Sequence, residues 1–195
     1  SCRWFDEPPA VGLMLSKHFN NKLYKKFDTA EYNLVFRQHL DSLRSQFLNP
    51  RTVKAFYTRR NFEPAMVLKH FDNGGLDSLK QYIENSGSHG FDAGNFRYDD
   101  LAKAYALLHA NKFASIEEVY PAVAALELSA AEALVRYHNF VYFGVLNPGR
   151  ILSKYQIKVA RPDSLSIVKV LETKDIAGLL AKIQPASDDY KVFQK

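Results

Sequence analysis

The chain has 195 residues, of which 47% are hydrophobic and 24% charged, an ordinary composition for a soluble globular protein that folds without disulfides or structural metals. Its single cysteine, Cys2, excludes an internal disulfide and a thiolate metal cluster, and no apolar stretch reaches the roughly 18 residues that a membrane-spanning helix needs. The formal net charge of +5 and the pI of about 9.2 permit attraction to acidic polymers, although no run of like charges concentrates it.

The first helical pattern covers residues 28–50. Asp28 is a candidate N-cap, and Glu31 follows three residues later. Apolar residues then recur at mostly helical spacing: Leu34, Val35, Leu40, Leu43, Phe47 and Leu48. Pro50 ends this element and opens the next helix, over residues 50–62. A loop at Gly74-Gly75 precedes a third predicted helix, over residues 76–87.

Later elements are predicted from two capping boxes, Ser115-x-x-Glu118 and Ser129-x-x-Glu132. They follow a helical pattern over residues 96–113, and they predict two consecutive helices with a break near Leu128. Residues 164–185 indicate two short helices that stop at Pro185, and only residues 155–160 alternate like a strand. We therefore predict an all-α fold, an irregular multi-helix bundle of about seven to nine helices.

Motifs of known chemistry are missing from the sequence. The six histidines form no His-x-x-x-His or His-Glu-x-x-His pair, and there is no phosphate-binding loop and no Gly-x-Ser-x-Gly. No catalytic residue, metal ligand or cofactor is therefore expected. One stretch, residues 56–62, mixes aromatic and basic side chains and suggests a stacking platform for a polymer. The candidate contacts are Arg37, Tyr57, Arg59 and Arg60, and the alternative is core aromatics with snorkelling arginines.

Four segments, taken in order, resemble one family. Their sequences are VKAFYTRRNFEPAM, LDSLKQYIENSGSHGFDAGNF, LELSAAEALVRYHNFVYFGVLNP and LLAKIQPASDDYKVF. Together they are similar to the helical scaffold domain found N-terminal to the catalytic domain of large L,D-transpeptidases, which cross-link peptidoglycan. The resemblance covers roughly residues 50–193. It divides the chain into an N-terminal segment with a capping helix, residues 1–49, and a scaffold-like domain, residues 50–195, which we expect to form one compact unit.

The string Ser88-His89-Gly90-Phe91 resembles the Ser/Thr-His-Gly-Cys of the transpeptidase active site, but phenylalanine replaces the cysteine nucleophile. The scaffold family offers another interpretation, because there His-Gly-hydrophobic-Asp is a turn after a helix. It corresponds here to residues 89–92, with Gly90 as a permissive backbone position and Phe91 as a core anchor. We interpret the likeness to the active-site motif as coincidence rather than a degenerate site.

The resemblance implies a non-catalytic region that supports peptidoglycan cross-linking. Its expected partners are a downstream catalytic domain, with the catalytic cysteine beyond Lys195, and peptidoglycan itself. The expected location is the periplasmic side of the cell envelope. Cys2 is a candidate lipid anchor, since a cysteine at the start of a mature chain is where bacterial lipoproteins are acylated, and it would provide the one membrane contact expected.

Three alternatives stay open from the sequence. One is a stand-alone module that binds peptidoglycan or an acidic wall polymer. Another is a basic helical nucleic-acid-binding domain, whose affinity falls steeply with salt, although we do not expect nucleic acid as a partner. The third is a hydrolase whose catalytic side chains converge from positions far apart in the sequence.

Overall fold

The computed structural model describes residues 7–89, 91–146 and 163–184, which contain helices and no β-strand. The nine α-helices of these ranges are α1 (Ala10–Phe19), α2 (Thr29–Leu43), α3 (Pro50–Arg59), α4 (Ala65–His70), α5 (Gly75–Asn85), α6 (Tyr98–Ala110), α7 (Ile116–Leu146), α9 (Ser164–Leu171) and α10 (Ile176–Ile183). Short 3₁₀ helices lie between some of them: η1 (Lys22–Lys26), η2 (Arg44–Gln46), η3 (Ser86–His89) and η4 (Ala93–Phe96). The predicted all-α class is confirmed.

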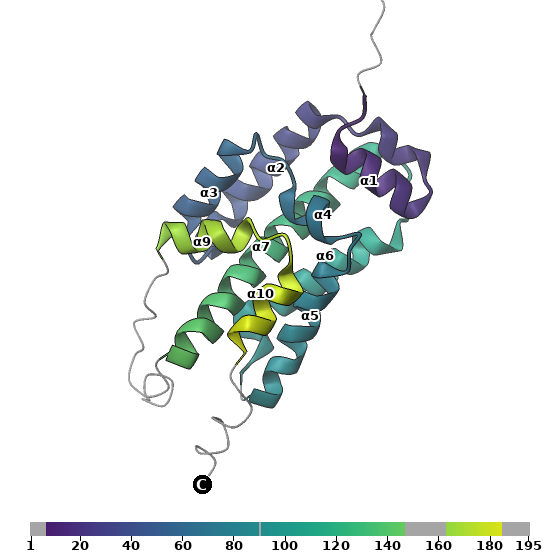
Figure 1. The fold of residues 1–195 in the computed structure, drawn as a ribbon. Helices are drawn as coiled ribbons and strands as arrows, with labels where there is room; N and C mark the ends of the chain where they lie inside the picture. Colours follow the sequence, from purple (N-terminus) through teal and green to yellow (C-terminus); the bar gives the residue numbers. More distant parts are fainter. Residues whose placement is uncertain (1–6, 90, 147–162, 185–195) are drawn as a thin grey trace, which may run out of the picture.

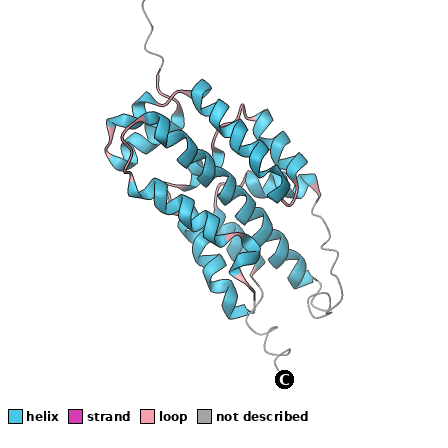
Figure 2. Ribbon diagram, turned by 180° about the vertical axis from the view of Figure 1, so that it is seen from behind, coloured by secondary structure: helices cyan, strands magenta, loops and turns pink. Residues whose placement is uncertain are grey.

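Helix α7 runs lengthwise through the molecule, and the other helices lie around it (Figure 1, Figure 2). It contacts α2, α4, α6, α9 and α10. Its sequence explains this position, because residues 122–135, apart from two glutamates, are apolar or small on every side of the helix and nearly all are buried. Glu127 and Glu132 are the two charged residues of that stretch, and both are buried. Buried carboxylates need hydrogen-bond partners, so these two positions mark polar sites inside the core.

The predicted starts of α2 and α3 are confirmed by their caps. Asp28 Oδ1 accepts a hydrogen bond from Glu31 N–H at 2.9 Å, as an N-cap does. Pro50 is the first residue of α3, where its missing N–H costs no helical bond. The preceding Asn49 Oδ1 accepts from Thr52 N–H at 3.2 Å. Local sequence therefore determines where both helices begin.

The predicted break near Leu128 is wrong, because α7 continues without interruption from Ile116 to Leu146. The first capping box does lie at the start of α7, where Glu118 Oε2 accepts from Ala114 N–H at 2.9 Å. In the second box, Glu132 Oε1 instead accepts a hydrogen bond from Leu48 N–H, in a distant segment. Burial of the apolar residues on both sides of the box stabilises a continuous helix more than a local cap would.

The two C-terminal helices, α9 and α10, confirm the prediction of two short helices. Each begins with an aspartate cap: Asp163 accepts from Ser166 N–H at 2.7 Å, and Asp175 accepts from Gly178 N–H at 2.9 Å. The predicted stop at Pro185 and the strand-like residues 155–160 lie outside the described residues. Helices α1 and α4 have no counterpart among the predicted elements.

The turn predicted after α5 is partly described. Phe91 is half-buried, and its ring lies edge-on to Phe140 with the centroids 4.7 Å apart, so the predicted core-anchor role is confirmed. Asp92 Oδ1 accepts a hydrogen bond from Gly94 N–H at 2.8 Å and starts η4. Gly90 lies outside the described residues. The backbone of Ser88 and His89 belongs to η3.

A single hydrophobic core cluster includes side chains from both sides of residue 49. Phe36 of α2 and Tyr57 of α3 illustrate this, with ring centroids 4.9 Å apart. Phe27 and Tyr120 of α7 pack edge-on at 5.1 Å. Aromatic contacts of this kind connect the N-terminal helices directly to the central helix.

Candidate functional site

The residues predicted to contact a polymer lie on α2 and at the end of α3, in different environments. Arg37 is exposed, and its guanidinium carbon lies 5.3 Å from the centroid of the Phe62 ring. Arg59 is exposed in the last turn of α3. Arg60 is half-buried, with its guanidinium carbon 4.6 Å above the Phe56 ring. Two of the three arginines, Arg37 and Arg60, therefore hold their cationic groups beside aromatic rings, as the basic-aromatic pattern predicts.

Tyr57 differs from the arginines because its side chain is 0% exposed. The side chain lies in the core beneath the surface, where its hydroxyl donates a hydrogen bond to Glu127 Oε1 at 2.6 Å. A buried ring cannot stack on a polymer, so the core interpretation applies to Tyr57. The polymer contact of the three arginines stays a prediction, and Cys2 lies outside the described residues.

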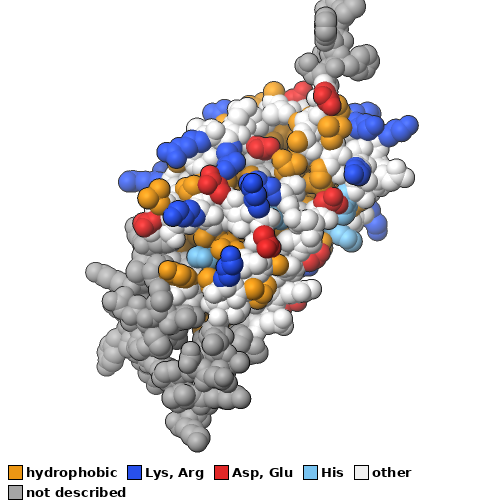
Figure 3. Space-filling model, viewed as in Figure 1, with side chains coloured by type: hydrophobic (Ala, Val, Ile, Leu, Met, Phe, Trp, Pro, Cys, Tyr) orange, Lys and Arg blue, Asp and Glu red, His pale blue; other side chains and the backbone are white. Residues whose placement is uncertain are grey.

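The charged side chains on the face shown in Figure 3 are mixed. Lys and Arg side chains are spread over this face with Asp and Glu between them. Some of the charged side chains of the molecule form ion pairs: Arg60 Nη2 lies 3.0 Å from Glu172 Oε1, and Lys54 Nζ lies 3.9 Å from Asp41 Oδ1. A protein that follows a nucleic-acid backbone typically presents a continuous basic stripe, which this face lacks.

The most unusual polar cluster of the core surrounds the Glu127 carboxyl group. Glu127 is fully buried in α7 and accepts three hydrogen bonds. The first comes from the Tyr57 hydroxyl, and the others from two N–H groups at the start of α4, Met66 N–H at 2.9 Å and Val67 N–H at 2.8 Å. Pro64 precedes α4 and provides no side-chain cap. Glu127 thus caps a helix that lies about 60 residues earlier in the chain.

Burial determines the ionisation of this cluster. Desolvation is the largest cause that raises the pKa of Glu127, from an ordinary 4.5 to about 7, against the lowering effect of the three donated hydrogen bonds. Burial and the neighbouring Glu127 charge also raise the pKa of Tyr57 well above its usual range. Tyr57 therefore stays protonated and keeps donating to the carboxyl oxygen at neutral pH.

This geometry suits a structural role better than a catalytic one. A general acid or base must reach a substrate proton within hydrogen-bonding distance. Glu127 has 0% of its surface exposed, and both of its oxygens face donors of the protein itself. The carboxyl group therefore works as a brace that holds α3 and α4 on the central helix α7.

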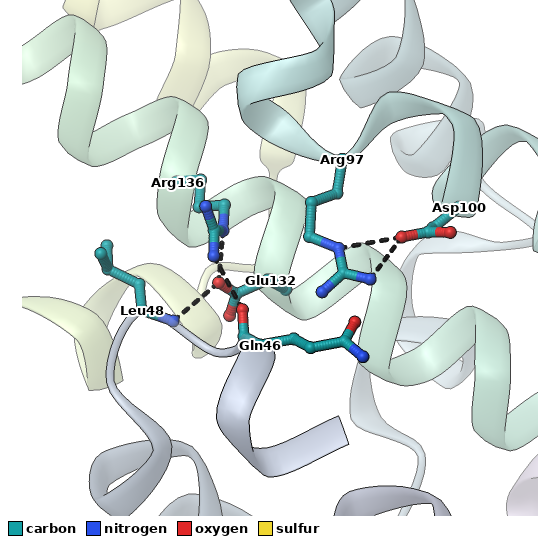
Figure 4. Close-up of polar contacts among 6 residues, drawn as sticks. All are labelled: Gln46, Leu48, Arg97, Asp100, Glu132 and Arg136. Atoms are coloured by element: carbon teal, nitrogen blue, oxygen red, sulfur yellow. Dashed lines mark hydrogen bonds and ion pairs between the residues drawn. The ribbon is translucent and has the colours of Figure 1, made fainter. Parts of the chain in front are cut away.

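A second buried carboxylate in α7 makes a similar brace, which Figure 4 shows in close-up. Glu132 Oε1 accepts hydrogen bonds from Leu48 N–H at 2.8 Å and from Arg136 Nε at 2.5 Å. Arg136 Nη2 then donates to the Gln46 carbonyl oxygen at 2.7 Å. The pair satisfies backbone groups of the segment between α2 and α3 and fixes that segment to α7.

Other titratable groups do not gather into a site within the described ranges. No group there of three or more His, Cys, Asp or Glu side chains is placed to hold a metal ion. His18 Nδ1 lies 2.6 Å from Asp72 Oδ1. His70 is fully buried, and desolvation is the main cause that lowers the pKa of its imidazole to about 4. None of the described helices is long and apolar enough to span a membrane.

Sequence reasoning did not identify the Glu127 cluster. One sequence feature could have indicated it: Glu127 lies in a helix that is otherwise apolar on every side. An acid in such a helix must be buried and therefore needs a hydrogen-bond partner. Its partners could not be identified, since Tyr57 and the start of α4 lie far from it in the sequence.

Comparison with known proteins gives one match. A family model described as a scaffold domain matches residues 51–195, more than half of the chain, from the first turn of α3 to beyond α10. No curated protein and no solved structure matches the chain significantly. The matched range coincides closely with the roughly 50–193 over which the sequence phrases show their resemblance.

Proposed function

This chain belongs to the scaffold-domain family, and we propose that it is the non-catalytic scaffold region of a bacterial L,D-transpeptidase-like protein. In that role it supports peptidoglycan cross-linking in the cell envelope. The observation that carries the proposal is the family match over residues 51–195. The proposed partner is a catalytic domain of the same protein that joins stem peptides through a cysteine acyl-enzyme.

The architecture supports a positioning role. The middle of the long helix α7, residues 122–135, is nearly all buried, and its two buried acids bind backbone groups of distant segments. Such braces keep the surface helices in fixed places, as a platform for another domain requires. Beyond η3, Phe91 packs against the core, with its ring edge-on to Phe140.

The proposed location is the periplasmic side of the envelope. Cys2 would carry the acyl chains if the mature protein is a lipoprotein, and intact mass spectrometry of the native protein tests this directly. An added mass of acyl groups at Cys2 supports the anchor, and an unmodified Cys2 in the native protein removes it.

The scaffold proposal is tested by isolating the native protein from its source cell with an antibody raised to this chain. We expect an intact mass well above the 22.2 kDa of this chain. We also expect peptide sequence beyond Lys195 that contains Ser/Thr-His-Gly-Cys. A native mass near 22.2 kDa would contradict the proposal and favour a stand-alone module.

A second candidate function, binding to an acidic wall polymer, rests on the exposed Arg37 and Arg59. Sedimentation with purified sacculi tests it. Substitution of each arginine by glutamine should lower the affinity by about threefold, the size of one exposed charge contact. Lys103→Gln on α6 is the matched control. Equal sedimentation of all variants would contradict this function, and binding to duplex DNA that weakens steeply with salt would favour the nucleic-acid alternative.

A further inference from the structure

Helix α1 and the 3₁₀ helix η1 form a hairpin whose charged side chains have one sign. Between residues 8 and 27 the chain has four lysines and no aspartate or glutamate. Lys17 lies in the last turn of α1, and Lys22, Lys25 and Lys26 belong to η1. All four lysines are exposed. The hairpin therefore carries four positive charges and no acid of its own.

The packing of η1 on α1 holds these lysines at the surface. A Cβ added to Gly12 would lie 2.7 Å from Tyr24 O, so glycine allows η1 to approach α1 this closely. The Tyr24 ring stacks on Phe19 with the centroids 5.4 Å apart, and the Tyr24 hydroxyl donates to Asn111 Oδ1 at 2.5 Å. Tyr24 is 0% exposed and thus anchors η1 in the core, while its lysine neighbours stay in solvent.

The outer side of α1 continues this charged area and adds an apolar residue. Leu13, Lys17 and Asn20 are exposed, and they recur at positions i, i+4 and i+7, which share one side of a helix. Leu13 has 38% of its surface exposed. The lysine surface is defined here by five residues: Leu13, Lys17, Lys22, Lys25 and Lys26.

Most of the charge on the lysine surface is not neutralised by ion pairs. Lys17, Lys22 and Lys25 form no ion pair with the residues that the structure describes. Lys26 lies close enough to Glu117, at the start of α7, for their charges to interact. Three of the four ammonium groups are therefore available to a partner outside the protein.

Several acids that border the hairpin bind partners inside the protein. Asp28 Oδ1 accepts from Glu31 N–H at 2.9 Å, and Glu31 Oε2 accepts from the Tyr120 hydroxyl at 3.3 Å. Asp72 Oδ1 lies 2.6 Å from His18 Nδ1. These contacts direct the three carboxylates toward groups other than the lysines.

Lysines around an exposed leucine fit a bilayer better than a soluble polyanion. Phospholipid headgroups present phosphates to lysines, and the acyl boundary beneath them accepts apolar side chains. Lysine stems are apolar too, and they lie along such a boundary while the ammonium groups stay at the headgroups. A soluble polyanion has no apolar phase, so it would leave Leu13 in water.

We propose that the lysine surface docks on an anionic phospholipid bilayer. The four ammonium groups contact lipid phosphates, and Leu13 reaches the acyl boundary between the headgroups. The hairpin is already packed on the core, so docking requires no ordering of α1 or η1. This proposal depends neither on the scaffold role nor on a lipid anchor at Cys2.

Vesicle co-sedimentation of the 195-residue chain tests the proposal. The anionic vesicles contain phosphatidylglycerol and phosphatidylcholine in equal parts, and vesicles of phosphatidylcholine alone are the neutral control. At an ionic strength of about 0.02 M, we expect the partition coefficient to be at least about twentyfold higher for the anionic vesicles. Salt screens exposed charges, so the difference should disappear near about 0.5 M. Equal binding to both kinds of vesicle, or no binding to either, would overturn the proposal.

Lysine variants locate the contact. Lys25→Gln combined with Lys26→Gln should weaken binding to the anionic vesicles by about 25-fold, since each lysine near such a surface contributes about fivefold. Lys174→Gln combined with Lys182→Gln is the matched control, because it removes the same charge beside and on α10, away from the hairpin (Figure 1). All four side chains are exposed, so both double variants should unfold at the wild-type temperature. Equal weakening by the two double variants would indicate attraction by net charge alone and overturn the proposed surface.

Leu13→Ser distinguishes a bilayer from a soluble polyanion. The variant keeps all four lysines and loses the exposed apolar side chain, so it should bind the anionic vesicles about threefold more weakly. Its affinity for polyphosphate, a soluble chain of phosphates, should equal that of the wild type. We expect the wild type to bind the vesicles more tightly than polyphosphate at equal phosphate concentration. Tighter binding of polyphosphate, or unchanged vesicle binding by Leu13→Ser, would identify a soluble polyanion as the partner and overturn the proposal.

Discussion

Two opposing effects determine the pKa of Glu127. Removal from water disfavours the charged form, and the three hydrogen-bond donors favour it. With burial the larger effect, the pKa rises from 4.5 to about 7. The folded protein therefore keeps a proton on Glu127 over a pH range in which the unfolded chain has lost it. The free energy of unfolding must consequently fall as the pH rises from about 4.5 to about 7.

The Glu127→Gln variant tests this linkage. Glutamine does not titrate, so the variant should lack the decrease in unfolding free energy that the carboxyl causes in the wild type, roughly 3 kcal/mol over this range. Urea unfolding of both proteins at several pH values measures it.

His70 makes the comparison between wild type and variant necessary. Burial lowers the pKa of His70 from 6.5 to about 4, so His70 makes stability rise with pH between these values. The two effects oppose each other in the wild type. When the unfolding free energy of the Glu127→Gln variant is subtracted from that of the wild type, the His70 contribution cancels and the Glu127 contribution remains. A difference that is constant between pH 4.5 and 7 would show that Glu127 has an unshifted pKa.

Tyr57→Phe tests the brace from the donor side. The change removes the 2.6 Å hydrogen bond to Glu127 Oε1 and keeps the ring in the core. At about pH 8, above the pKa of about 7, Glu127 is ionised, and we expect a loss of about 2 kcal/mol in the free energy of unfolding, the range for a hydrogen bond to a charged group. Tyr82→Phe, on the half-buried Tyr82 of α5, is the control and should change stability by less than about 1 kcal/mol. Equal effects of the two variants would argue against the brace.

At the scale of the elements, α7 shows that tertiary packing can outweigh a local capping signal. The Ser129-x-x-Glu132 pattern favours a helix start, yet the helix continues through it. In a continuous helix, the amides of Ala130 and Ala131 bond to carbonyls one turn earlier, whereas after a break near Leu128 they would be unpaired. Hydrogen exchange read residue by residue should therefore show both amides as protected as those of Leu126 and Leu134. Fast exchange confined to Ala130 and Ala131 would restore the predicted break.

The Asp28 cap of α2 is a local interaction that stability measurements can isolate. Asp28→Ala removes the oxygen that accepts from Glu31 N–H, and should cost about 1 kcal/mol of unfolding free energy. Asp41→Ala on the same helix is the control, since Asp41 makes only a 3.9 Å contact with Lys54 at the surface. Thermal unfolding should show a lower midpoint for the first variant alone.

Elements whose signals are local could be predicted from the sequence. Asp28, Pro50 and Ser115 each mark a helix start because the cap and the first turn are neighbours in the chain. The start of α4 could not be predicted, because Glu127 caps it from another helix. The burial of Tyr57 against α7 could not be predicted either. Helical spacing places Tyr57 on one side of α3, but it does not show that this side faces α7.

At the scale of the whole molecule, one buried helix organises the fold. Helices from both sides of residue 49 pack on α7, and two of its acids reach backbone groups of α4 and of the segment before α3. A close-packed core connected in this way deforms little and suits a domain that positions another. The match to a scaffold domain agrees with this arrangement.

Trapping the acyl-enzyme distinguishes a scaffold from a catalytic unit. The native protein and the 195-residue chain are each incubated with a peptidoglycan stem peptide, and any acylated cysteine is located by tandem mass spectrometry. We expect cross-linked product and a stem-peptide acyl group only with the native protein, on a cysteine outside residues 1–195. Turnover by the 195-residue chain alone, or a stem-peptide acyl group on its single cysteine, Cys2, would contradict the scaffold role.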